Sequence, residues 1–359
     1  LCLGGNNPVR VQSMTNTNTQ DVEASFEQCR RIIDAGGELV RLTVQGKKEV
    51  ESIKKVREKL RDYGYQTPVV ADVHFNPVVA EALAPFVEKV RINPGNYADK
   101  RARFQPVEFT EEEYQAELER ITDRIKPLIQ LCKKHGTAIR IGVNHGSLSD
   151  RIMSRYGNTP EGMVEAAMEF LRIARSFPFH EMLVSLKASN VRVMVQAYRL
   201  LVTRMKEENM DYPLHLGVTE AGSGNEGRIK SAVGIGALLA DGLGDTIRVS
   251  LTEAPEQEIP VAQTLVNHFS DIRPSHLPGN EIPIAYPVFS YEKRTSRKTG
   301  FLGKDQVPRV MLDLSQRNIE PSVLSETGYY NKNGQWHAKA GAAELLYVGK
   351  QPVEFKIST

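Results

Sequence analysis

Apolar and polar positions follow a repeating order between residues 9 and 269, in which a short apolar run precedes an amphipathic stretch. Short apolar runs bounded by turn residues are typical of buried strands, whereas apolar residues three or four apart indicate helices. The predicted strands are Val9–Met14, Leu39–Val44, Pro68–Phe75, Lys89–Asn93, Ala138–Val143, Met182–Lys187, Pro213–Thr219 and Thr246–Leu251. The predicted helices are Asp21–Ala35, Lys48–Tyr63, Glu111–His135, Glu161–Ser176, Val191–Glu208, Gly227–Ala240 and Glu256–Phe269.

This alternation predicts an α/β protein with a (β/α)8 TIM barrel, since eight strands, most followed by a helix, fit within roughly 250 residues. A doubly wound open sheet is the alternative, but it usually has fewer repeats. The alternation of strand-like and helix-like stretches ends near Leu277, and the residues that follow contain short β-like pieces without helices between them. We therefore expect a substrate-binding barrel over residues 1–276. Residues 277–359 are expected to be the incomplete start of an inserted α/β or β-rich domain, too short for a core of its own.

Five predicted strands each carry one cation close to the carboxyl end, where barrel enzymes build their sites. These are Arg41, Arg91, Arg140, Lys187 and Arg248. Any one of them could pair with a carboxylate, but the strand ends offer chiefly Asp72 and Glu220. The remaining positive charge calls for a negative ligand. Phosphate or diphosphate suits the planar fork of arginine, and Ser250 shares one side of its strand with Arg248.

Other polar residues end the strands beside these cations. Asp72 and His74 are two residues apart, so they share a face and could bind a metal, transfer protons, or form a structural pair. We favour a hydrogen-bonded role beside substrate, because no third metal ligand is apparent. Asn144 ends another strand, and its alternative is ordinary loop chemistry. The Gly-x-Gly-x-x-Gly spacing after Glu220 is a weak dinucleotide signal, and a phosphate site after strand seven fits a barrel better.

Composition excludes several classes of function. Lys and Arg number 46 against 44 Asp and Glu, which gives no support to nucleic-acid binding. No apolar run approaches the roughly 20 residues that span a bilayer, so no membrane partner is expected. The three cysteines, Cys2, Cys29 and Cys132, are widely spaced, which favours a reducing compartment. They do not form the usual cysteine set of an iron–sulfur cluster, and no metal site is predicted in this chain.

Seven stretches, in this order along the chain, resemble the 4-hydroxy-3-methylbut-2-enyl diphosphate synthase family of the non-mevalonate isoprenoid pathway. They are Val11–Thr17, Ala71–Phe75, Arg91–Asn96, Arg140–Asn144, Val184–Ser189, Thr219–Gly222 and Arg248–Leu251. The family's substrate domain is a TIM barrel, in agreement with the strand count. The resemblance implies a two-electron reductive ring opening and dehydroxylation of 2-C-methyl-D-erythritol 2,4-cyclodiphosphate. It also implies an oxidoreductase that uses a [4Fe–4S] cluster and receives electrons from ferredoxin or flavodoxin.

The resemblance further implies roles for individual residues. Arg41, Arg91, Arg140, Lys187 and Ser250 resemble the diphosphate cradle of the family. Asp72, His74, Asn144, Glu220 and Arg248 resemble the residues around the carbon skeleton, and Asp72, His74 and Glu220 are the expected catalytic residues.

The family's iron–sulfur domain has no counterpart in these residues. Residues 277–359 resemble the opening of the extra domain in the three-domain form of the enzyme. The expectation is a barrel fragment, inactive alone, from the bacterial cytoplasm or, in a plant, from the plastid. Two other hypotheses stand beside it: a non-redox phosphate-ligand barrel of the pterin-binding synthase type, and a module that serves only binding or assembly.

Overall fold

A computed structural model describes residues 1–98, 109–270 and 295–353, together with residues 355 and 357. The chain divides into two compact units, Leu1–Asn280 and Glu281–Thr359. Two predictions concern residues outside the described ranges. The sequence makes the long basic loop Gly95–Thr110 a candidate lid, with an ordinary solvated loop as the alternative, and the middle of this loop is not described. It also predicts a β-like piece at Ile282–Phe289, which lies outside the described ranges.

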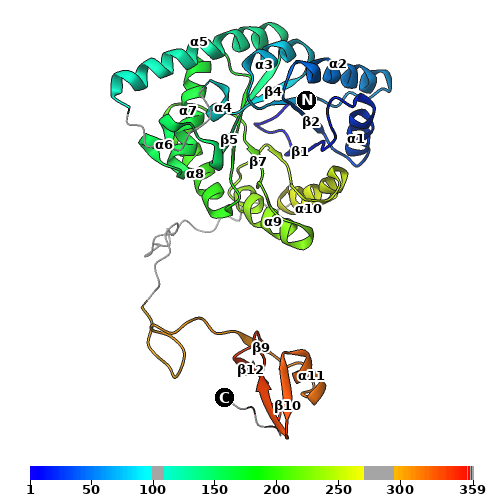
Figure 1. Ribbon diagram of the computed structural model, residues 1–359, viewed down its shortest axis with the longest axis vertical. Coiled ribbons are helices and arrows are strands. Elements are labelled where there is room, and N and C mark those ends of the chain that lie inside the picture. Colours follow the sequence, from blue (N-terminus) through cyan, green and yellow to red (C-terminus); the bar gives the residue numbers. More distant parts are fainter. Residues whose placement is uncertain (99–108, 271–294, 354, 356, 358–359) are drawn as a thin grey trace. The chain divides into compact units, whose positions relative to one another are not determined.

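The first unit is a barrel of eight parallel strands, as predicted (Figure 1). The strands are β1 (Arg10–Met14), β2 (Leu39–Val44), β3 (Val69–Val73), β4 (Lys89–Ile92), β5 (Ala138–Asn144), β6 (Met182–Lys187), β7 (His215–Leu216) and β8 (Thr246–Ile247). They pair in the order β6-β5-β4-β3-β2-β1-β8-β7. A parallel bridge between Val184 and Leu214 joins β6 to the residues just before β7 and closes the ring. β7 and β8 are only two residues long, much shorter than the sequence pattern predicts.

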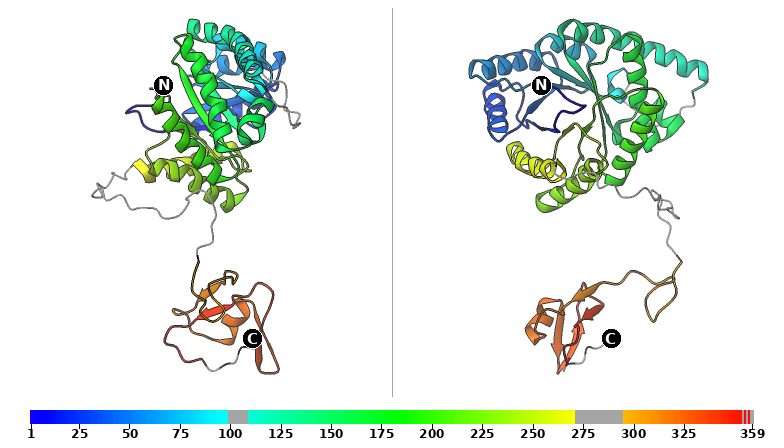
Figure 2. Two further views of the ribbon diagram at one scale, coloured as in Figure 1. Left: turned by 90° about the vertical axis from the view of Figure 1, so that its left-hand side faces the viewer. Right: turned by 180° about the vertical axis from the view of Figure 1, so that it is seen from behind.

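Helices surround the strands, as Figure 2 shows from the side and from behind. They are α1 (Val22–Asp34), α2 (Lys47–Asp62), α3 (Pro77–Leu83), α4 (Pro94–Tyr97), α5 (Glu111–His135), α6 (Asp150–Tyr156), α7 (Pro160–Ser176), α8 (Val191–Glu207), α9 (Gly224–Ala240) and α10 (Glu258–Ser270). Short 3₁₀ turns occupy Ala84–Phe86, His145–Ser147 and Pro255–Gln257. The sequence pattern misses α3 and α6, because seven residues are too few to show a helical period.

Local sequence explains where the helices begin and end. The side chain of Asn93 accepts a hydrogen bond from the backbone N–H of Gly95 and caps α4. Pro94-Gly95, a dipeptide typical of turns, therefore begins one turn of helix after β4. Thr110 and Glu113 form a capping box at the start of α5, and Gly136 ends that helix with φ 68°.

Strand alternation separates the hydrophobic core from the barrel interior. On β2, Val40, Leu42 and Val44 are fully buried and belong to the main hydrophobic cluster. Arg41 lies between them, and successive side chains on a strand point to opposite faces. Its guanidinium therefore faces the inside of the barrel. The same alternation on β4 and β5 sends Arg91 and Arg140 inward.

The second unit is small. β9 (Met311–Asp313) pairs in parallel with β12 (Leu345–Tyr347), close to where β-like pieces are predicted. β10 (Tyr329–Lys332) and β11 (Gln335–Ala338) form an antiparallel hairpin, and α11 spans Pro321–Glu326. The hairpin and α11 do not follow from the sequence pattern. Leu324, Tyr329 and Trp336 form the buried cluster of this unit.

Candidate functional site: a cationic barrel mouth

The predicted cations converge on one pocket of about 170 Å³ at the carboxyl ends of the strands. Its lining comprises Met14, Arg41, Thr43, Asp72, His74, Arg91, Arg140, Asn144, Ser185, Lys187, Val218, Thr219, Arg248 and Ser250. Nine of the ten residues selected from the sequence are in this set. Glu220 is the exception: it lies in a neighbouring pocket of about 340 Å³ that also includes Asn144 and Lys187.

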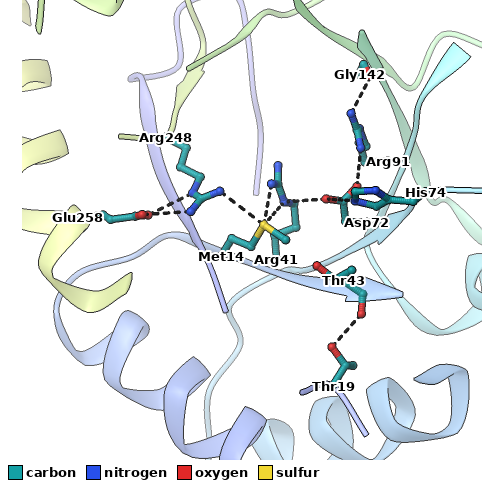
Figure 3. Close-up of polar contacts among 10 residues, drawn as sticks. All are labelled: Met14, Thr19, Arg41, Thr43, Asp72, His74, Arg91, Gly142, Arg248 and Glu258. Atoms are coloured by element: carbon teal, nitrogen blue, oxygen red, sulfur yellow. Dashed lines mark hydrogen bonds and ion pairs between the residues drawn. The ribbon is translucent and has the colours of Figure 1, made fainter. Parts of the chain in front are cut away.

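The carboxylate of Asp72 joins two of the arginines (Figure 3). Arg91 Nη1 donates to Oδ1 at 2.9 Å, and Arg41 Nε lies 3.3 Å from Oδ2. His74 Nε2 is also 3.3 Å from Oδ2. Burial alone would raise the pKa of Asp72, but Arg91 and Arg41 hold it well below the usual range. Asp72 is thus an ionised anchor for the arginines, and its expected catalytic role remains a prediction.

Glycines on neighbouring strands make room for the long cationic side chains. Arg91 Nη2 donates to the carbonyl of Gly142 at 2.8 Å. A Cβ atom at position 142 would lie 2.2 Å from Arg91 Nε. A Cβ atom at position 217 would likewise lie 2.9 Å from the Nζ of Lys187. Side chains at either position would collide with a cation of the mouth.

Arg248 has a carboxylate partner that the sequence reasoning missed. Glu258, at the start of α10, accepts from Arg248 Nη2 at 3.0 Å and from its Nε at 3.1 Å. Glu258 is 1% exposed and also accepts hydrogen bonds from Ser13 Oγ and the Leu251 N–H. Glu220, the other carboxylate that the sequence places at a strand end, is exposed, and its backbone adopts φ 52°. Asp72 and Glu220 are the carboxylates that the sequence places at the strand ends, and Glu258, beyond β8, is a further one that the sequence reasoning did not consider.

Among the described residues, Arg140 and Lys187 form no ion pair with a carboxylate. Arg140 is fully buried, and within the described part of the chain its Nε and Nη1 have no hydrogen-bond partner. Burial and the neighbouring arginines lower the pKa of both side chains well below their ordinary values. Five cationic side chains thus line this mouth, and in the ranges that the structure describes only the carboxylates of Asp72 and Glu258 pair with them.

Lys89 is a further buried cation that sequence reasoning overlooked. It is 3% exposed, and its Nζ has no hydrogen-bond partner among the described residues. Burial, with smaller contributions from Arg140 and Arg41, lowers its pKa well below the usual value. It precedes Arg91 by two residues on β4, so strand alternation would have placed both on one face. Unlike Arg91, it does not line the pocket.

Replacing Lys89 by methionine should raise the free energy of unfolding by about 1–4 kcal/mol near neutral pH, because a buried amine without a partner gives way to an apolar side chain. The unfolded chain protonates this amine below pH ~10.4, whereas the folded chain binds the proton only at lower pH. Its contribution therefore makes stability rise with pH towards that value. Urea unfolding at pH 7 and pH 9 should show a smaller rise in K89M than in the parent chain. An equal rise in both would contradict the assignment.

The cysteines do not fit an iron–sulfur cluster. Cys29 and Cys132 are fully buried in the hydrophobic cluster, where burial raises the pKa of each thiol to about 12, and Cys2 is exposed near the chain start. Among the residues that the structure covers, no group of three or more His, Cys, Asp or Glu side chains could hold a metal ion. No helix in those ranges is long and apolar enough to span a bilayer.

The fold and the pocket together define a parallel (β/α)8 barrel with a cationic mouth. A family model described as the GcpE TIM-barrel domain matches residues 1–263, and the chain belongs to this family.

Two curated relatives are named as 4-hydroxy-3-methylbut-2-en-1-yl diphosphate synthases. The chain is 58% identical over 329 residues to 4-hydroxy-3-methylbut-2-en-1-yl diphosphate synthase (flavodoxin) of Phocaeicola vulgatus, a match that covers 91% of this chain and 53% of the relative. It is 55% identical over 267 residues to the chloroplastic, ferredoxin-type enzyme of Arabidopsis thaliana, covering 74% and 36% of the two chains. The chain thus spans about half the length of the bacterial relatives it matches. Among solved structures, a Clostridium difficile type I 3-dehydroquinate dehydratase aligns with a TM-score of 0.48 at 12% identity, covering 75% of this chain and 95% of that one.

Proposed function

We propose that this chain is the substrate-binding part of an enzyme that reductively opens 2-C-methyl-D-erythritol 2,4-cyclodiphosphate to (E)-4-hydroxy-3-methylbut-2-enyl diphosphate. One observation carries the proposal: five cationic side chains surround a single pocket, and only Asp72 and Glu258 form ion pairs with them among the described residues. A bound diphosphate supplies the missing negative charge. The family match and the names of the relatives support this choice of ligand.

The diphosphate is held by Arg41, Arg91, Arg140, Lys187 and Ser250. Arginine presents two parallel N–H donors to phosphate oxygens, whereas the ammonium of Lys187 acts as a compact point charge. An adjacent phosphoryl group favours the protonated form of Lys187 and reverses the effect of burial on its pKa. Binding of the diphosphate therefore offsets the free-energy cost of keeping this buried lysine charged, a cost that the barrel without ligand has to bear.

The carbon skeleton lies beside His74, Asn144 and Glu220, which border the two adjoining pockets. Asp72 and Glu258 keep Arg91, Arg41 and Arg248 in position around it. Glu220 is the expected catalytic carboxylate. Its left-handed backbone is a strained conformation for a non-glycine residue, and such conformations cluster at functional sites.

Ring opening consumes two electrons and two protons and releases one hydroxyl as water. The cysteines of this chain cannot hold the [4Fe–4S] cluster that we propose as the electron source. We therefore assign no redox step to the described residues, and expect no turnover from this chain alone. Flavodoxin and ferredoxin, which the names of the relatives mention, are the proposed electron donors. We place the activity in the bacterial cytoplasm or, for a plant chain, in the plastid.

Calorimetry with the cyclodiphosphate tests the proposal. We expect binding of one ligand per chain, weakened by added salt because charge attraction dominates. Replacing Arg140 by methionine should lower the affinity by about 10–100-fold, the value of a charge-assisted hydrogen bond. The control is Arg199→Met, which removes an exposed arginine on α8 that pairs with Asp241.

Two other results would favour the competing hypotheses. Tighter binding of a pterin diphosphate than of the cyclodiphosphate would favour a synthase of the pterin-binding type. A binding or assembly module would bind neither ligand at this mouth, and alanine at Arg91 and Arg140 would leave its main interaction unchanged.

A further inference from the structure

The sulfur of Met14 lies between two guanidinium groups at the centre of the mouth (Figure 3). Arg41 donates to Met14 Sδ from Nη2 at 2.7 Å and from Nε at 3.1 Å. Arg248 approaches the same atom from the opposite side, with its Nη1 at 3.5 Å. Met14 is the last residue of β1 and is half-buried.

A thioether is an unusual partner for this position, because sulfur is only a weak hydrogen-bond acceptor. The other sides of these guanidiniums have carboxylate partners: Asp72 lies beside Arg41, and Glu258 binds Arg248 bidentately. Two of the groups directed at Met14, Arg41 Nη2 and Arg248 Nη1, take no part in those ion pairs, whereas Arg41 Nε also lies 3.3 Å from Asp72 Oδ2. Groups of this kind usually pair with carboxylate or phosphate oxygens.

We infer that Met14 is a displaceable stand-in for the ligand, and that its sulfur occupies the place which a phosphoryl oxygen takes between Arg41 and Arg248 when diphosphate binds. This inference rests on the diphosphate site of the proposed function. Methionine suits the task because its three rotatable bonds let the thioether move aside. Met14 also has a positioning role, because its sulfur keeps the guanidinium groups of Arg41 and Arg248 apart and directed at the pocket before the ligand binds.

Other residue types would fail here for opposite reasons. A carboxylate would pair with both arginines and compete with the ligand. A branched apolar side chain would leave their buried N–H groups without an acceptor, which is costly. The thioether of Met14 accepts weakly from the N–H groups of Arg41 and Arg248 in the barrel without ligand, and a phosphoryl oxygen displaces it easily.

The Met14→Glu variant tests the charge preference of this position against Met14→Gln, which has the same length and no charge. The glutamate should raise Tm by about 2–4 °C relative to the glutamine, because its carboxylate supplies the missing anion. It should also weaken binding of inorganic diphosphate at least about 100-fold, since a like charge then occupies the phosphoryl position. A Met14→Glu variant no more stable than Met14→Gln, or one that still binds diphosphate as the glutamine variant does, would overturn the inference.

Methyl NMR tests displacement directly. The full chain labelled at its nine methionine methyl groups gives one signal that disappears in Met14→Leu and so belongs to Met14. Saturating inorganic diphosphate should shift that signal, while Met194, a fully buried residue of α8, serves as the internal reference. A merely structural role would leave the Met14 signal unchanged while diphosphate binds, and that result would refute the stand-in.

The outcomes also separate the inference from the proposed function. If inorganic diphosphate shifts Met14 but the cyclodiphosphate does not bind, the proposed substrate is wrong and the stand-in survives. If the cyclodiphosphate binds without moving Met14, only the stand-in fails. If neither ligand binds, both are overturned.

Discussion

Replacing Asp72 by asparagine should lower the free energy of unfolding by about 3–5 kcal/mol, because it leaves two buried arginines without their shared carboxylate. Arg91 and Arg41 are 5% and 7% exposed, and both lie within ion-pair distance of this one side chain. Because asparagine has nearly the same shape as aspartate, the loss of stability measures the effect of the missing charge and not that of a cavity. Urea unfolding at pH 7 measures it.

The matched control is Asp241→Asn, which breaks an ion pair with Arg199 on the barrel surface. Exposed pairs contribute about 0–1 kcal/mol, so this variant should be nearly as stable as the parent. Inorganic diphosphate should also raise Tm more in Asp72→Asn than in the parent chain, because the anion replaces part of the lost charge. Equal losses of stability in the two variants would show that Asp72 does not anchor the arginines.

The same variant has a defined dependence on pH. The pKa of Asp72 is depressed in the folded chain, so its contribution to stability is fully present above pH ~4, the range of an unfolded aspartate. That contribution is lost as pH falls below this value towards the folded pKa. The stability gap between parent and Asp72→Asn should therefore narrow below pH 4 and stay constant from pH 5 to 8.

The barrel and the cations of its mouth could be predicted because both depend on short-range pattern. Strand alternation has a period of two, and an arginine such as Arg91 within an apolar run can only face the interior of a parallel barrel. Since all eight strands end at one rim, cations far apart in sequence meet there. The convergence therefore follows from topology alone.

The partners of these cations could not be predicted, because they depend on how loops fold back. Glu253, Glu256 and Glu258 follow β8 closely, and the sequence pattern does not distinguish them. The 3₁₀ turn Pro255–Gln257 and the first turn of α10 bring Glu258 under Arg248. Met14 was overlooked for a different reason: a methionine in a strand is usually an apolar core residue, and only the folded structure shows its sulfur between two guanidinium groups.

Replacing Lys187 by methionine should change ligand binding and stability in opposite directions. Affinity for inorganic diphosphate should fall about 10–100-fold, because the ammonium donates a charge-assisted hydrogen bond at the pocket wall. The free energy of unfolding should rise by about 1–4 kcal/mol, because Lys187 is 7% exposed and the charges nearest to it are arginines. Calorimetry and urea unfolding of the same preparation measure both effects.

Lys89→Met is the matched control, because Lys89 is also a buried lysine, 3% exposed against 7%, but does not line the pocket. Its Nζ has no hydrogen-bond partner in the described structure. Both variants should be more stable than the parent chain, and only Lys187→Met should lose the ligand. Loss of binding in both would mean that diphosphate responds to the total charge of the barrel and not to a cradle of particular residues. Loss of stability in Lys187→Met would mean that its ammonium already has a partner in the free chain. The expected pair of results would instead show that the positive mouth is maintained at the expense of stability, as a site shaped for an anion requires.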